Sequence, residues 1–128
     1  MAKILIVEDE KDMVQVMMER LDSYGHDVDV AFDALQAMMK LSKYKPDLVL
    51  LDISMPAGGG LQVLRNIRMN IRLFALPVII MTGSQDEKIK EEAKKLGVAA
   101  YYIKPLDINV LKEKIAEIVK EKDAPEEA

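Results

Sequence analysis

Five short strand-like runs, four of them apolar and one (residues 26–30) alternating polar and apolar residues, alternate along the chain with longer segments in which apolar residues recur every three or four positions. The runs occupy residues 3–7, 26–30, 48–51, 77–82 and 99–103. Short runs closed by turn-forming residues are typical of buried strands, and a spacing of three or four is typical of helices with one apolar face. The alternation predicts an α/β fold: a doubly wound five-stranded parallel sheet with five helices, joined by right-handed crossovers.

The predicted helices follow the strands, and several have clear boundary residues. Their apolar stripes are Val14, Met17 and Leu21; Ala34, Ala37, Met38 and Leu41; Leu61, Leu64, Ile67 and Ile71; Ile89, Ala93 and Leu96; and Leu111, Ile115 and Ile118. Asp33 is placed to cap the second helix, and Ser84 with Glu87 fits a capping box for the fourth. Gly25 and Gly97 follow helices as C-terminal caps. Residues 68–75 contain no clear stop signal.

Composition narrows the class of protein. The chain has 128 residues, which suits one domain, and no cysteine, which excludes disulfides and thiol chemistry. Its net charge of −4 gives little support for direct nucleic-acid binding. No apolar run approaches the ~18 residues of a membrane span, and the N-terminus lacks a signal-peptide pattern. We expect a cytoplasmic domain over residues 1–121, followed by an acidic, disordered tail over residues 122–128.

Polar residues stand where four of the predicted strands end. Glu8 and Asp9 follow the first strand, Asp52 ends the third, Thr82 ends the fourth and Lys104 follows the fifth. Parallel strands point the same way, so these residues should meet at the carboxyl edge of the sheet, where α/β proteins bind ligands. Each has an ordinary explanation alone, such as a helix start, strand propensity or a surface lysine. The occurrence of all five residues at strand ends, in this order, favours a ligand-binding site.

The chemistry of that site follows from its side chains. Three neighbouring carboxylates repel one another unless a cation binds between them. A site made of a few carboxylates and water molecules suits Mg²⁺. A hydroxyl and an ammonium on the same edge provide a donor and a charge for a phosphoryl group. The set indicates that Asp52 acts as a nucleophile that holds a phosphoryl group.

Four segments together resemble the receiver domain of two-component response regulators, in particular the stand-alone CheY-like type. They are residues 4–10 (ILIVEDE), 46–56 (PDLVLLDISMP), 78–84 (VIIMTGS) and 97–105 (GVAAYYIKP), and the resemblance covers residues 3–121. It implies a flavodoxin-like sheet of order 2-1-3-4-5, in which the first and third strands are neighbours.

The resemblance also implies a role for each matching residue. Asp52 would be the phosphoacceptor, and Glu8 and Asp9 would hold Mg²⁺ with an Asp52 oxygen and the backbone carbonyl of Ser54. Thr82 and Lys104 would each bind a phosphoryl oxygen.

It further implies a switch. Tyr101 would swing inward behind Thr82, and the face of the fourth helix, fifth strand and fifth helix would change shape. The Lys104–Pro105 peptide bond would be cis.

Three positions depart from the family pattern. Glu8 stands where Asp is commoner, Gly59 where the family often has Asp, and Gly83 where Ala or Ser is typical. The first puts metal binding slightly in question, and the others could alter the loop and access to the phosphoryl group. His26, the only histidine, is expected to be exposed and structural, without a role in phosphotransfer.

We therefore expect a signalling switch and not an enzyme. A sensor histidine kinase or histidine phosphotransfer protein would phosphorylate it with Mg²⁺, and its affinity for a downstream protein target would change; dimerisation on phosphorylation is left open. The alternatives are an aspartate-nucleophile phosphatase, a receiver-like docking module that is never phosphorylated, and a flavodoxin-like cofactor binder. Ser54 stands where a haloacid-dehalogenase-type phosphatase would have a second Asp, and acids replace a phosphate-cradling loop after the first strand.

Overall fold

The computed structural model describes residues 2–56 and 59–123, and the side chains up to residue 120. Five strands alternate with five helices. The strands are β1 (Lys3–Val7), β2 (Asp27–Ala31), β3 (Leu48–Asp52), β4 (Val78–Thr82) and β5 (Ala100–Ile103). The helices are α1 (Lys11–Ser23), α2 (Ala34–Lys43), α3 (Gly59–Met69), α4 (Glu87–Leu96) and α5 (Ile108–Asp123).

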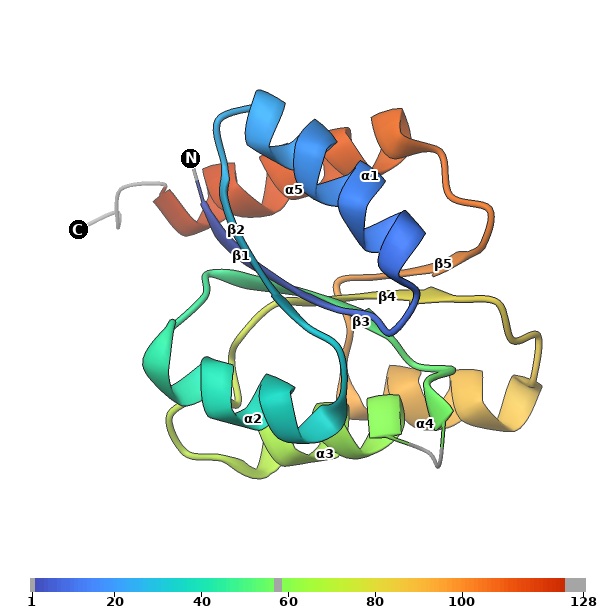
Figure 1. The fold of residues 1–128 in the computed structure, drawn as a ribbon. Coiled ribbons are helices and arrows are strands. Elements are labelled where there is room, and N and C mark those ends of the chain that lie inside the picture. The colour runs from blue at the N-terminus through green and yellow to red at the C-terminus, as the bar shows by residue number, and fades with distance from the viewer. Residues whose placement is uncertain (1, 57–58, 124–128) are drawn as a thin grey trace.

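The strands form one parallel sheet in the order β2-β1-β3-β4-β5, which confirms the predicted fold. β3 lies at the centre and is buried over its whole length. Helices α1 and α5 cover one face of the sheet, and α2, α3 and α4 cover the other (Figure 1). The order makes β1 and β3 direct neighbours, so the loops that follow them lie side by side.

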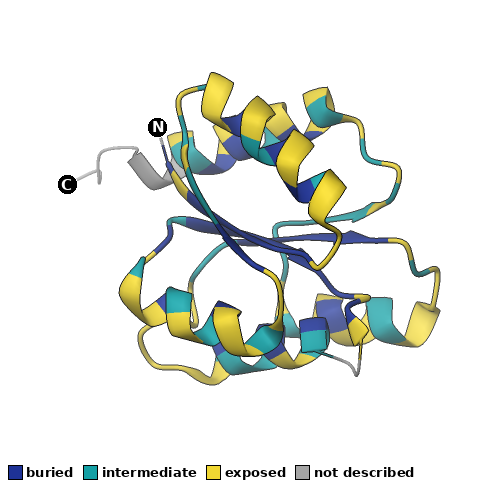
Figure 2. Cartoon of the chain, viewed as in Figure 1, coloured by how far each residue is buried: buried dark blue, intermediate teal, exposed yellow. Residues whose placement is uncertain are grey.

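Side chains alternate between the two faces and build two cores. Ile4 and Ile6 of β1 join the core under α1 and α5, whereas Leu5 and Val7 join the core under α2, α3 and α4. The same alternation places Tyr101 and Tyr102 of β5 on opposite faces. Buried residues therefore follow the sheet and the inner helix faces, and exposed residues cover the outside (Figure 2).

Local signals set several boundaries as predicted. The Asp33 side chain accepts a hydrogen bond of 2.7 Å from the Gln36 N–H and caps α2. Gly25 and Gly97 follow α1 and α4 with φ of 92° and 93°, a region that glycine enters without strain.

The predicted capping box of α4 is wrong. Asp86 is the N-cap, and its carboxylate accepts a hydrogen bond from the Lys88 N–H. The Ser84 hydroxyl instead accepts a hydrogen bond from the Asp86 N–H, one turn before the helix. Asp86 stands directly before the first helical residue, so its side chain reaches a free N–H group of the first turn, whereas Ser84 lies too far from the helix to do so.

The apolar face predicted for α3 extends beyond the end of the helix and is wrong at Ile71. The helix ends at Met69, and Ile71 lies in a turn with 86% of its surface exposed. The Asn70 side chain accepts a hydrogen bond from the Arg72 N–H, and the Asn70 carbonyl accepts from Leu73 and Phe74. An asparagine that bonds its own backbone in this way offers the chain an alternative to the helix.

The remaining expectations concern the edges of the domain. Strand β2 begins one residue later than predicted, so His26 precedes it. His26 is half-buried and not exposed as predicted, and its Nδ1 accepts a hydrogen bond from the Ala2 N–H. Helix α5 continues through Asp123, two residues past the predicted domain end, and the rest of the acidic tail lies outside the described residues. None of the described helices is long and apolar enough to cross a membrane.

Candidate functional site

The ends of four strands meet at the carboxyl edge of the sheet. Strand pairing places Val7 level with Leu51, so Glu8 and Asp52 occupy equivalent positions on neighbouring strands. Asp52 pairs with Met81, one residue before Thr82, and Thr82 pairs with Ile103. The sheet thus brings together residues from four segments that are remote in sequence.

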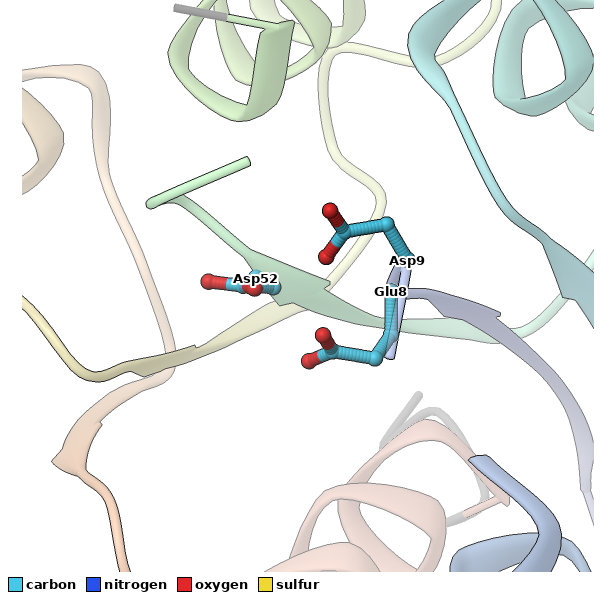
Figure 3. Close-up of side chains that lie close together, drawn as sticks. All are labelled: Glu8, Asp9 and Asp52. Atoms are coloured by element: carbon cyan, nitrogen blue, oxygen red, sulfur yellow. The ribbon is translucent and has the colours of Figure 1, made fainter. Parts of the chain in front are cut away.

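Three carboxylates converge at this edge. Glu8, Asp9 and Asp52 each offer an oxygen, and these oxygens all lie within 4.8 Å of one another. Glu8 and Asp52 are buried, whereas Asp9 is exposed on the opposite side of the loop (Figure 3). Figure 3 shows the Glu8 and Asp9 side chains diverging from adjacent residues, with Asp52 beside them.

Lys104 follows the edge strand β5 and reaches the cluster from there. Its Nζ lies 2.9 Å from Glu8 Oε2 and 3.4 Å from Asp52 Oδ2. Burial alone would lower the pKa of Lys104, but its hydrogen bond to Glu8 and the charge of Asp52 raise it above the usual value. The peptide bond between Lys104 and Pro105 is cis. With its raised pKa, Lys104 is a cation that pairs with two of the three carboxylates of the pocket.

Glu8 has an unusual proton affinity. Burial raises its pKa from 4.5 to about 7, and the negative charge of Asp52 adds to this effect. Hydrogen bonds from Lys104 and the Glu10 N–H oppose it only in part. A cation that enters the pocket would therefore compete with a proton at this side chain.

The Asp52 carboxylate is held from both sides. Its Oδ1 accepts hydrogen bonds from the Ser54 N–H at 2.9 Å and the Ser54 hydroxyl at 2.6 Å, and its Oδ2 faces Lys104. Thr82 is fully buried, and its Oγ1 accepts a hydrogen bond of 3.0 Å from the Ser84 N–H. Because Thr82 Oγ1 is the acceptor in that bond, its own proton is available for another partner.

Tyr101 lies behind Thr82 on the same face of the sheet. It pairs with Ile80 of β4 and packs in the core that α4 covers. Its hydroxyl is buried and finds no hydrogen-bond partner among the described residues, while the ring has Lys90 Nζ 5.7 Å from its centroid. A buried hydroxyl without a partner costs free energy, so this position of the ring is not strongly favoured.

The donor set fits a small, hard divalent cation. Mg²⁺ binds oxygen at about 2.0–2.1 Å, so opposite ligands on one ion are roughly 4.2 Å apart. The three carboxylate oxygens are within 4.8 Å of one another, close to that limit. Two of the three acids are buried with one lysine, which leaves an excess of negative charge for the cation to offset.

Sequence reasoning identified the members of the pocket but missed two of their contacts. It assigned Lys104 to a phosphoryl group and did not anticipate its pairing with Glu8. It considered only the backbone carbonyl of Ser54, whereas the Ser54 hydroxyl also bonds Asp52. A serine two residues after an aspartate is typical of side-chain turns, and that signal was present in the sequence.

Fold and site together define a class of protein: a doubly wound α/β domain with an acidic pocket and one lysine at the carboxyl edge of its sheet. Comparison with known proteins identifies the family. Residues 4–116 match the response regulator receiver domain, and the chain belongs to this family. The family identification made from the sequence is thereby confirmed.

Individual relatives agree with this assignment. The chain is 36% identical over 111 residues to response regulator ArlR of Staphylococcus saprophyticus, covering 87% of this chain and 49% of ArlR. It is 34% identical over 113 residues to sporulation initiation phosphotransferase F of Bacillus subtilis, covering 88% of this chain and 90% of that protein. The chain thus spans about half the length of ArlR but nearly all of phosphotransferase F.

A solved structure shows the same fold. A two-component response regulator from Clostridium difficile superimposes with a TM-score of 0.87 at 28% identity, covering 97% of this chain and all of the other.

Proposed function

We propose that this receiver domain is a phosphorylation switch and that Asp52 is its phosphoacceptor. The observation that supports this most is the placement of Asp52: it is buried, faces Lys104, and shares one pocket with Glu8 and Asp9. The phosphoryl donor would be a sensor histidine kinase or a histidine phosphotransfer protein. Membership of the receiver family supports this class of donor.

Phosphoryl transfer would proceed by direct displacement. An Asp52 carboxylate oxygen attacks phosphorus, the bond between phosphorus and the donor's imidazole nitrogen breaks, and the electron pair returns to the imidazole. Lys104 would move from the carboxylates to a phosphoryl oxygen, and the free proton of Thr82 Oγ1 would bond another. Both groups offset negative charge at the phosphoryl oxygens as the new bond forms.

Mg²⁺ is the cation that we propose for the acidic cluster. Glu8, Asp9, one Asp52 oxygen and the Ser54 carbonyl would hold it, and when bound it supplies positive charge beside the phosphoryl group. The Ser54 hydroxyl would keep the carboxylate oriented while the oxygen that faces Lys104 stays open to the donor.

The signal would leave through Thr82 and Tyr101. A Thr82 side chain drawn toward the phosphoryl group vacates space in front of Tyr101, whose unpaired hydroxyl leaves the ring free to reposition. The face of α4, β5 and α5 would then change its affinity for a protein target.

Labelling with a small phosphodonor tests the assignment. Wild-type chain incubated with ³²P-phosphoramidate and Mg²⁺ should take up close to one phosphoryl group per molecule, and Asp52→Asn should take up none. Asp12→Asn, an exposed aspartate of α1, is the matched control and should label like wild type. Equal labelling of Asp52→Asn and wild type would refute the assignment. Sustained release of many phosphates per molecule would favour the phosphatase alternative.

A further inference from the structure

A groove of about 800 Å³ opens at the amino edge of the sheet, where β3 and β4 begin. The end of α2, the turn between α3 and β4, and the C-terminal half of α5 form its walls, and Figure 1 shows all three at this edge. Pro46 in the groove and Asp52 are six residues apart along an extended chain, or roughly 20 Å, so the groove is separate from the acidic pocket. The apolar walls consist of Leu41, Pro46, Leu73, Leu76, Pro77 and Ile118.

The turn between α3 and β4 exposes large apolar side chains. Met69 is 84% exposed, Ile71 is 86% exposed and Phe74 is 59% exposed. The same turn supplies Leu73 and Leu76 to the groove. Single exposed apolar residues are ordinary, but a cluster of them beside a hollow marks an interaction surface. A small molecule held in the groove would leave Ile71 and Phe74 uncovered, which favours a macromolecule as the occupant.

Hydrogen bonds hold this turn in one shape. The Arg68 guanidinium donates to the Phe74 carbonyl at 3.1 Å and to the Leu76 carbonyl at 2.8 Å. The Asn70 carbonyl accepts from the N–H groups of Leu73 and Phe74 at 3.0 and 2.9 Å. A partner would therefore meet a preformed surface, and binding would lose little free energy to the ordering of this turn.

The charges that line the groove are positive. Lys45 and Arg72 are its charged lining residues within the described part of the chain; both are exposed, and neither forms an ion pair with a described acid. The described acids next to lining residues in the sequence are engaged elsewhere. Asp47 accepts a hydrogen bond from the first N–H of β1, and Glu117 pairs with Lys114. A partner of complementary charge would carry carboxylates.

Lys45 has an unusual backbone conformation at the rim of the groove. Its φ is 52°, and among the described residues it alone has a positive φ without being glycine. Glycine enters this region without the steric cost that a side chain brings. A lysine here lowers stability slightly, and a contact made by its side chain in a complex would offset that cost.

We propose that this groove docks a protein segment that is apolar on one side and acidic at its flanks. The segment inserts an apolar side chain between Leu73 and Ile118 and places carboxylates against Lys45 and Arg72. An anchor in a concave pocket contributes more to binding than the flat contacts around it. The inference goes beyond the proposed function and does not depend on it: the partner binds whether or not Asp52 carries a phosphoryl group, because the two sites lie at opposite edges of the sheet.

Other occupants fit the groove less well. In a two-fold pair of this chain, the same surface meets itself, so Lys45 and Arg72 of both copies would come together and repel. A bilayer attracts cations but presents no side chain that would fill the hollow between α2 and α5.

A phage-displayed library of random linear peptides supplies the probe. Clones are selected on the wild-type chain after passage over Ala75→Trp, which fills the groove at an exposed lining residue and so removes peptides that bind other surfaces. The selected peptides should combine large apolar residues with an excess of Asp and Glu. An empty selection, or selected peptides with a net positive charge, would overturn the proposal.

Variants then locate the binding of the best peptide by calorimetric titration. Arg72→Glu reverses a charge at the rim and should raise the Kd at least tenfold. Lys45→Gly should raise the Kd several-fold while unfolding at the same temperature as wild type or higher, because it removes the steric cost of the positive φ. Arg20→Glu on α1 and Ala116→Trp on α5 make matched changes at exposed residues and should stay within twofold of wild type. Wild-type affinity in both Arg72→Glu and Lys45→Gly would refute the groove as the docking site.

Three further measurements identify a different occupant. Sedimentation of the chain with phosphatidylglycerol vesicles, abolished by Arg72→Glu, would assign the groove to a membrane. A dimer in sedimentation velocity that Ala75→Trp dissociates would assign it to a second copy. At least tenfold tighter peptide binding by a chain shortened after Asp123 would assign it to residues 124–128. Each of these results would overturn docking of a partner protein.

The independence from phosphorylation has its own test. Asp52→Asn, and wild type treated with phosphoramidate and Mg²⁺, should bind the peptide within twofold of untreated wild type. A tenfold change in Kd after the phosphoramidate treatment would contradict the claim that the partner binds in both states. Circular dichroism and thermal unfolding of each variant establish that weaker binding does not come from misfolding.

Discussion

At the scale of single residues, Glu8 links the pocket to pH. Its raised pKa means that the folded chain holds this proton more tightly than the unfolded chain does. Stability from this group is fully present below pH 4.5 and is lost as the pH rises through about 7, because the ionised carboxylate is buried beside Asp52. A divalent cation in the pocket would reverse this dependence on pH, since it would bind only the ionised form of Glu8.

We therefore predict that Mg²⁺ affinity depends on pH. From pH 8 to pH 6 the Kd should rise about tenfold in total, with most of the rise below pH 7, because binding must release the Glu8 proton. Calorimetric titration at pH 6, 7 and 8, in buffers of different ionisation enthalpy, measures both the affinity and the proton release. Glu8→Gln should bind weakly and lose this dependence, whereas Glu10→Gln, on a neighbouring exposed side chain, should keep it. An affinity of wild type that is constant from pH 6 to 8 would contradict the assignment of Glu8.

At the scale of elements, the start of α3 is packed directly against the strand that bears Asp52. A Cβ built on Gly60 would lie 2.3 Å from the Asp52 carbonyl oxygen and 2.5 Å from Ile53 Cα. Both are backbone atoms, which cannot turn aside as the end of a side chain can. The absence of a side chain at residue 60 is thus what lets helix and strand approach.

Gly60→Ala should destabilise the fold by about 1–3 kcal/mol, because the extra methyl group forces helix and strand apart. It should also slow labelling by phosphoramidate, since the Asp52 peptide must shift. The neighbouring Gly59→Ala meets only ordinary contacts and should stay within about 0.5 kcal/mol of wild type. Denaturant unfolding measures both. Equal stability of the two variants would show that the close approach at residue 60 is unimportant.

Arg68 connects three segments on the α4 side of the sheet. Its guanidinium donates hydrogen bonds to the carbonyls of Leu96 and Gly97 at the end of α4, and of Phe74 and Leu76 in the turn after α3. The distances range from 2.8 to 3.1 Å. A planar group with five donors can satisfy these four carbonyls together, and a lysine cannot.

Arg68→Met should cost about 1–3 kcal/mol of stability, because the carbonyls around it lose their donor. Arg68→Lys should recover little of that loss. Arg72→Met removes the charge of an exposed arginine in the same turn and should change stability by less than about 0.5 kcal/mol. Thermal and denaturant unfolding give the comparison, and a wild-type stability for Arg68→Met would show that the hydrogen bonds contribute nothing net.

These elements also show what the sequence could predict. Strands and helices followed from local patterns, and caps such as Asp33 act over three residues, so both were predictable. The strand order came from the family resemblance, because periodicity does not determine which strands pair. The ion pair between Lys104 and Glu8 joins residues that are 96 positions apart in the sequence. The hydrogen bonds of Arg68 to the end of α4 depend on where that helix ends. No local sequence pattern predicts either contact.

At the scale of the whole molecule, the site and the proposed output surface lie on one continuous path. Thr82 ends the strand that pairs with β5, and Lys104 follows β5 directly, so both candidate phosphoryl ligands are attached to the elements that would change. The Lys104 N–H also donates to the Thr82 carbonyl at 2.8 Å. A rearrangement at the pocket would therefore reach β5 through the backbone as well as through side chains.

Removing the Thr82 hydroxyl should separate phosphorylation from the structural response. We predict that Thr82→Ala still labels with phosphoramidate, at a rate a few-fold below wild type, because Asp52, Lys104 and the acidic cluster remain. Hydrogen–deuterium exchange of α4 and β5 should change when wild type is phosphorylated and stay unchanged in phosphorylated Thr82→Ala. Thr82→Ser keeps the hydroxyl and should restore the response. If phosphorylated Thr82→Ala shows the full wild-type change, the signal reaches α4 without Thr82, and the backbone link through Lys104 must be sufficient alone.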